Sequence, residues 1–215
     1  MTKTAVHTVY RLADGTRVPS VTTYLSVLGK PAIIHWAWKM GCEGLDYRKV
    51  RDEAGEIGTL AHYLIMCQLK GMEPDVTEYS EDIQTRAATC LVKFDAWMKE
   101  HIVEPVLVEE YLVSEIYGFG GTSDFYGLVD GVPTLVDFKT SGGIYEDYFP
   151  QVAAYEVLLK ESGYLVDNVR ILRIGRNEDE GFEDQTITNR EPAWELFLHC
   201  QAIYELKKQI KKSSW

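Results

Sequence analysis

The sequence predicts an α/β fold of the α+β type, in which helices flank a central mixed β-sheet. Three observations predict it. Residues 20–100 carry apolar side chains at helical spacing, whereas the runs between 105 and 140 are rich in β-branched and aromatic residues. Glycine and Asp-Gly turns separate those runs, and a helical stretch at 148–163 precedes a further strand. Helices, a β-meander, a helix and more strands are the order expected of packed sheet and helix layers.

Length and composition limit the classes of protein that remain. The 215 residues, of which 46% are hydrophobic, are enough for one substantial core, so we expect a single domain over 1–215. A formal charge of −11 excludes indiscriminate binding of polyanions, and any contact with phosphate must be local. No apolar run approaches the ~18 residues that span a bilayer. We therefore expect no membrane partner. The four cysteines are scattered, as in a reduced cytosolic protein.

The N-terminal region predicts a hairpin and two helices. Asp14-Gly15 lies between two short strand-like runs, and Ser20 can cap a helix that extends to about residue 28. The run at 33–47 is apolar on most sides, so we expect a buried helix there. We interpret Trp36 and Trp38 as anchors of the core rather than as rings that stack on nucleobases.

Two longer helices follow, at about 53–69 and 81–100. The second presents one apolar face, which we expect to pack on the body of the protein. Its residues are Ile83, Ala87, Cys90, Leu91, Phe94, Trp97 and Met98.

The later elements are expected as three strands, a helix, two strands and a final helix. Asp130-Gly131 predicts a tight hairpin between the second and third strands. The expected strands are 105–118, 118–130, 133–140, 168–175 and 182–188, and the expected helices are 148–163 and 192–211.

Charged side chains occur within two of these strands. Asp137 and Lys139 are two residues apart and therefore share a face of their strand, opposite to Val136 and Phe138. The tight turn brings Asp124 of the neighbouring strand toward them. Two carboxylates with open positions suit Mg²⁺ or Mn²⁺, which polarise a phosphate and lower the pKa of bound water, and a lysine can orient or deprotonate the nucleophile. On these residues alone, an ion pair that pins two strands is the favoured interpretation.

Two flanking motifs change that balance. Together with Asp124 and the segment Asp137-Phe138-Lys139, GTLAH (58–62) and QVAAY (151–155) resemble the PD-(D/E)XK nuclease superfamily. They are similar to its RecB-like branch, which includes phage-type exonucleases and the mitochondrial genome maintenance exonuclease. The resemblance covers roughly residues 18–176 and implies a restriction-endonuclease-like core.

The resemblance implies a role for each matching residue. His62, Asp124, Asp137 and the backbone carbonyl of Phe138 would bind metal, and Lys139 would be catalytic. In the family, the residues that match Gln151 and Tyr155 border the site and position the substrate strand. As i and i+4 on a helix, both face one surface, although ordinary helix packing explains them too.

Accessory residues are less sharply defined. Glu109 corresponds to an acid often found on the preceding strand of this branch, but Glu110 is adjacent and a register error would exchange their faces. Three hydroxyl side chains could donate to phosphate oxygens, although turn hydrogen bonding explains them as well: Thr122, Ser123 and Thr140.

These motifs predict a metal-dependent DNA nuclease, an exonuclease that hydrolyses phosphodiester bonds with metal-activated water in replication, recombination or repair. We expect it in the cytoplasm of a bacterium or a phage-infected host cell. DNA, single-stranded or with ends, is the expected partner, with a single-strand annealing, helicase or replication protein. No iron–sulfur cluster is expected, because Cys200 stands alone after Cys90.

Two alternatives remain open. One is a catalytically inactive module of the same fold that binds nucleic acid or protein, against which the presence of His62, both aspartates and Lys139 argues. The other is an enzyme that hydrolyses small phosphorylated metabolites, which requires a closed pocket.

Overall fold

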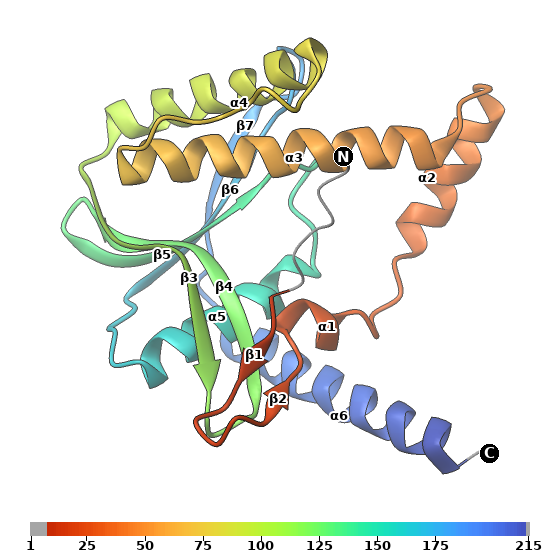
Figure 1. The fold of residues 1–215 in the computed structure, drawn as a ribbon, viewed down its shortest axis with the longest axis vertical. Helices are drawn as coiled ribbons and strands as arrows, with labels where there is room; N and C mark the ends of the chain where they lie inside the picture. Colours follow the sequence, from red (N-terminus) through yellow and green to blue (C-terminus); the bar gives the residue numbers. More distant parts are fainter. Residues whose placement is uncertain (1–7, 214–215) are drawn as a thin grey trace.

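A five-stranded mixed sheet lies at the centre of the fold, seen here in a computed structural model that describes residues 8–213 (Figure 1). The strand order is β3-β4-β5-β6-β7, and all neighbours are antiparallel except β5 and β6. The strands are β3 (Val103–Ser114), β4 (Phe119–Val129), β5 (Val132–Lys139), β6 (Asn168–Ile174) and β7 (Phe182–Thr186). A separate hairpin, β1 (Tyr10–Arg11) and β2 (Arg17–Val18), precedes them. The predicted mixed sheet is therefore confirmed.

Helices cover both faces of this sheet. The helices of the fold are α1 (Val21–Leu25), α2 (Pro31–Cys42), α3 (Tyr47–Lys70), α4 (Glu81–Glu100), α5 (Tyr148–Glu161) and α6 (Glu191–Ser213), and all except α2 contribute to the cover of the sheet. One core lies between the sheet, α3 and α4, and the other between the sheet, α1, α5 and α6 (Figure 1). Among the described residues, no helix is both long and apolar enough to cross a membrane.

Strand alternation divides the side chains of β5 between the two cores. Val136 and Phe138 pack in the core with α3 and α4, whereas Leu135 packs in the core with α5. Since successive side chains of a strand point to opposite faces, Asp137 and Lys139 lie on the α5 side. The predicted separation of these residues from Phe138 is confirmed.

Local signals account for the element boundaries. Asp130 and Gly131 both have positive φ values, 54° and 79°, as a two-residue type I′ hairpin turn requires. Ser20 caps α1 as predicted, but this helix ends at Leu25. Helix α3 begins at Tyr47, earlier than expected, because the side chain of Asp46 accepts a hydrogen bond from the backbone of the first turn.

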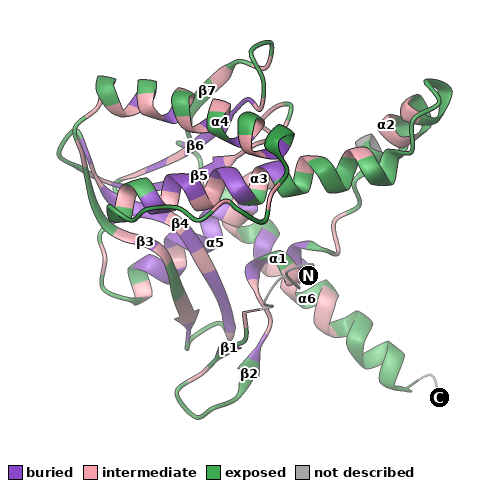
Figure 2. Ribbon diagram, turned by 45° about the horizontal axis from the view of Figure 1, so that its top comes forward, coloured by how far each residue is buried: buried purple, intermediate pink, exposed green. Residues whose placement is uncertain are grey.

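The prediction of a buried helix over 33–47 is wrong. Helix α2 ends at Cys42 and stands away from the sheet, and most of it is exposed (Figure 2). Trp38 is 64% exposed, and Trp36 is only partly buried, so neither ring anchors a core. Apolar composition predicted burial, but no layer of the body covers this helix.

Candidate active site

The candidate site lies where β4 and β5 separate. Their pairing runs from the turn to Phe125 opposite Val136 and extends no further. Beyond that point the side chain of Asp124 takes the place of a strand contact, because its Oδ2 accepts the backbone N–H of Phe138 at 2.7 Å. In an extended strand the N–H and C=O of one residue point to the same side, so the carbonyl of Phe138 also faces β4.

An irregularity in β3 and β4 changes which way the side chains point. A side chain at Gly121 would meet Tyr155 of α5, whereas Phe125, four residues later, packs with α3 and α4. In a regular strand these two residues would share a face. In β3, the residue before Glu109 pairs with Phe125 of β4, and the residue after it pairs with Ser123. Glu109 itself has a positive φ of 51°. Such strained backbone is uncommon for a glutamate, and irregularities of this kind re-aim side chains next to active sites.

Three potential metal ligands converge at this irregularity. Ligand atoms of His62, Glu109 and Asp124 all lie within 4.8 Å of one another, and His62 Nδ1 is 3.4 Å from Asp124 Oδ1. The exposed Glu110 is outside this group, so the structure distinguishes the two adjacent glutamates.

A close helix–strand contact positions His62. Helix α3 passes the end of β5 at Gly58, where a Cβ atom would lie 2.7 Å from Thr140 Oγ1. Gly58 is the first residue of the GTLAH motif, and its missing side chain allows this approach.

A second group of side chains connects β5 to α5. Lys139 Nζ lies 2.6 Å from Asp137 Oδ2 and donates a hydrogen bond to Gln151 Oε1 at 3.2 Å. Gln151 Nε2 in turn donates to Tyr155 Oη at 3.0 Å. The ring of Tyr148 lies 4.9 Å from Lys139 Nζ, which places the ammonium over an aromatic face. Of the predicted residues of QVAAY, Gln151 therefore contacts the predicted lysine directly, and Tyr155 is connected to it through Gln151.

The electrostatics of this region are those of crowded, buried charge. Burial, with the neighbouring Asp124 carboxylate, raises the pKa of Glu109 to about 7. Burial raises the pKa of Asp137 to about 6, although Lys139 opposes it. Burial also raises the pKa of Asp124, but His62 and Lys139 outweigh this and lower it.

The two basic groups respond to the same carboxylates. Burial lowers the pKa of His62 and of Lys139, yet the adjacent aspartates outweigh this and raise both values. The raised pKa values of Glu109 and Asp137 show that their charged forms are disfavoured in this site, and a bound cation would stabilise those charged forms.

The donor set fits a divalent metal ion. Asp137 is fully buried; its Oδ2 lies 2.6 Å from Lys139 Nζ, whereas its Oδ1 has no hydrogen-bond donor among the described residues. Buried carboxylate oxygens without donors leave acceptor capacity for a ligand. Carboxylates from Asp124, Asp137 and Glu109, with the imidazole of His62, are suited to Mg²⁺ or Mn²⁺ that retains open positions.

The accessory hydroxyls have other surroundings. Thr122 Oγ1 is hydrogen-bonded to Tyr10 Oη at 2.8 Å, and Thr140 packs against Gly58. Ser123 is fully buried, and its hydroxyl has no partner among the described residues. These contacts give Thr122 and Thr140 structural partners.

Sequence reasoning missed Tyr148. It contacts Lys139, and the spacing of residues 148, 151 and 155 on α5 could have indicated this, because side chains three and four apart share a helix face.

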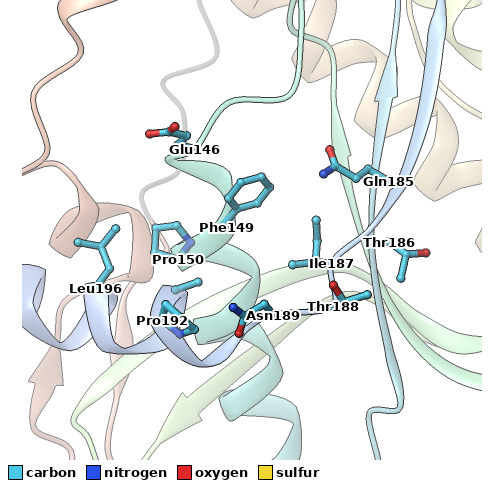
Figure 3. A pocket seen from close by; sticks show the side chains of 11 residues that line it. Glu146, Phe149, Pro150, Gln185, Thr186, Ile187, Thr188, Asn189, Pro192 and Leu196 are labelled. Carbon is cyan, nitrogen blue, oxygen red and sulfur yellow. The ribbon is translucent and has the colours of Figure 1, made fainter.

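A hollow of about 440 Å³ lies away from these residues, between the start of α5, the end of β7 and the start of α6 (Figure 3). None of the predicted site residues lines it. The chemistry of the site therefore does not depend on this hollow.

Comparison with known proteins gives structural matches alone. No family model and no curated protein matches the chain. LHK-Exo, an alkaline exonuclease of Laribacter hongkongensis solved in complex with dAMP, is 16% identical; the match covers 72% of this chain and 83% of that chain, with a TM-score of 0.40. A protein of Eubacterium rectale that is assigned as an exonuclease is 11% identical; that match covers 69% of this chain and 66% of that chain, with a TM-score of 0.50. The chain shares its overall fold with the Eubacterium rectale structure, and its mixed sheet flanked by helices is the α/β architecture that the sequence predicts.

Proposed function

We propose that this protein is a Mg²⁺- or Mn²⁺-dependent DNA nuclease, and that it acts as an exonuclease. One observation carries the proposal: His62, Glu109 and Asp124 converge within 4.8 Å, beside the buried Asp137–Lys139 pair. An ion pair that only pins two strands needs neither the histidine nor the third carboxylate. The exonucleases among the structural matches agree with this reading.

Each group has a role in this proposal. His62, Glu109, Asp124, Asp137 and the carbonyl of Phe138 hold the metal, which when bound polarises a phosphoryl oxygen and lowers the pKa of a water.

The chain's own lysine acts on the substrate. Lys139, held between Asp137 and Gln151, donates to a phosphate oxygen or orients the nucleophile. Gln151 and Tyr155 position the lysine, and with it the substrate strand.

A direct assay tests this proposal. Single-stranded, duplex and circular DNA, labelled separately at each end, are incubated with Mg²⁺, alongside a mononucleotide ester. We expect release of short products from linear DNA and none from the circle, since an exonuclease needs an end. Cleavage of the ester alone would support the metabolite hydrolase, and binding of DNA without any cleavage would support the inactive binding module.

Salt dependence provides a further prediction. Because the chain carries a formal charge of −11, DNA binding must depend on a few local contacts with phosphate. We expect the logarithm of the affinity for single-stranded DNA to fall with the logarithm of salt concentration by about 0.7 per phosphate contact. Fluorescence anisotropy over a salt series measures this slope. An affinity that is the same at low and moderate salt would contradict a phosphate-binding site.

A further inference from the structure

A larger hollow, of about 790 Å³, lies beside the candidate site. Its walls come from the segment before α2, from α2 itself, from the loop before α5 and from α6. Among the described residues, three aromatic rings line it, those of Trp36, Tyr145 and Tyr148. The hollow thus gathers aromatic side chains from parts of the chain that are far apart in sequence.

This hollow is connected directly to the candidate catalytic lysine. The ring of Tyr148, which forms part of its wall, lies 4.9 Å from Lys139 Nζ. Lys139 Nζ in turn is 2.6 Å from Asp137 Oδ2. A nucleotide whose phosphate is bound at Lys139 would therefore have its sugar and base within reach of the hollow.

The charges of the hollow favour a neutral ligand. Lys30 is the cationic residue that lines it in the described part of the chain, and its ammonium is already paired with Asp147 Oδ2 at 2.7 Å. Glu146 adds a second carboxylate to the wall. Phosphate would be repelled here, whereas an uncharged aromatic group would find apolar surface and ring faces.

The aromatic rings are accessible to a ligand. Tyr145 is 48% exposed, and it meets Tyr148 edge to face at 5.6 Å, so this contact occupies one face of only one of the two rings. Trp36 is partly buried and likewise meets Tyr47 edge to face, at 6.3 Å. Nucleobases stack on such rings without regard to sequence.

We propose that this hollow binds unpaired nucleobases of a single DNA strand whose backbone enters the candidate site, and that Trp36 and Tyr145 stack on them. The proposal rests on the proposed nuclease function for the identity of the ligand. It also explains why the apolar helix α2 is not covered by the body: one of its tryptophans faces the substrate. The neighbouring hollow in Figure 3 shares Glu146 and Leu196 with this one, but offers Phe149 as its single aromatic ring among the described residues.

Binding to two probes tests the proposal without cleavage. The probes are a short fluorescein-labelled oligothymidylate and an abasic oligonucleotide of the same length, which keeps the phosphates and lacks the bases. With excess chelator present, we expect the wild type to bind the oligothymidylate about 5- to 100-fold more tightly, as stacking of one or more bases implies.

Matched variants locate the origin of that preference. We expect Trp36→Ala and Tyr145→Ala each to reduce the preference for the oligothymidylate several-fold, mainly by weakening its binding. Trp38→Ala, on the same helix but outside the hollow, and Tyr145→Phe, which keeps the ring, should both retain it. Melting temperatures close to that of the wild type show that the variants are folded.

The outcomes separate this proposal from the nuclease proposal. If Trp36→Ala retains the full preference for bases, the stacking proposal is overturned, even if the protein cleaves DNA. If no DNA is cleaved but the preference depends on Trp36 and Tyr145, stacking stands and the nuclease proposal fails. A third outcome is that the wild type self-associates, that Trp36→Ala abolishes this association, and that neither probe is preferred. That outcome would assign the hollow to a second copy of the chain and overturn the proposal.

Discussion

Replacing Lys139 with alanine should reduce DNA cleavage by at least about 10²- to 10⁴-fold, the range for loss of one positioned acid–base group. Binding of DNA should change little. The ammonium lies between Asp137 and Gln151, where it can stabilise charge that develops on a phosphate in the transition state. An interaction that is strongest in the transition state contributes to rate more than to binding. Single-turnover cleavage and anisotropy on one preparation measure the two effects.

A structural role for Lys139 makes the opposite prediction. Asp137 is fully buried, so loss of its partner would leave a buried carboxylate uncompensated and destabilise the fold by roughly 3–5 kcal/mol. Lys160→Ala is the control for removal of a lysine from a buried carboxylate that keeps a second cationic partner, because Glu156 pairs with both Lys160 and Arg190. A Lys139→Ala variant that melts much earlier but cleaves at nearly the wild-type rate would defeat the catalytic assignment.

Mg²⁺ and Mn²⁺ should stabilise the protein against thermal unfolding, and Glu109→Gln should lose most of this stabilisation. A ligand at 100 times its Kd raises the free energy of unfolding by about 2.7 kcal/mol. The adjacent Glu110→Gln variant should respond as the wild type does, because Glu110 is exposed and lies outside the cluster. Differential scanning fluorimetry measures the shift. Equal shifts in both variants would remove Glu109 from the metal site.

The same stabilisation should depend on pH. The pKa of Glu109 is raised from 4.5 to about 7, so the folded, metal-free protein holds this proton more tightly than the unfolded chain does. The contribution of the Glu109 carboxyl to the stability of the metal-free protein is therefore present at low pH, and it is lost as pH rises from about 4.5 through about 7. A metal must displace the proton, and the thermal shift should be larger above pH 7 than below it.

Calcium separates metal binding from catalysis. We expect Ca²⁺ to raise the melting temperature without supporting cleavage, since it accepts looser, higher coordination and activates water poorly. Full cleavage after exhaustive chelation would contradict a metal-dependent mechanism altogether.

Local signals in the sequence were sufficient for most elements of the fold. The Asp130-Gly131 turn predicted the β4–β5 hairpin, and with it the approach of Asp124 to Asp137, because a two-residue turn with two positive φ values sets the register of the strands that it joins. Two-residue alternation placed Lys139 on the α5 side and Phe138 in the other core. These features depend on neighbours in the chain, which a sequence displays directly.

The exposure of α2 was not predictable in the same way. Ile33, Ile34 and Trp38 are apolar, and composition alone made a buried helix the natural expectation. Burial depends on whether another layer lies over the helix, and nothing local to the segment specifies that.

By itself, the sequence determined the order of the elements, the division of β5 between two cores and the spacing of the motif residues. Only the tertiary structure decided between Glu109 and Glu110, because the change of strand face occurs at a residue with positive φ that alternation alone does not reveal. The packing of the layers also brought His62 to Asp124 through the close approach of α3 at Gly58. It placed Tyr148 of α5 beside Lys139 of β5. Contacts between distant segments form where layers pack, and the pattern along one segment does not contain the position of another.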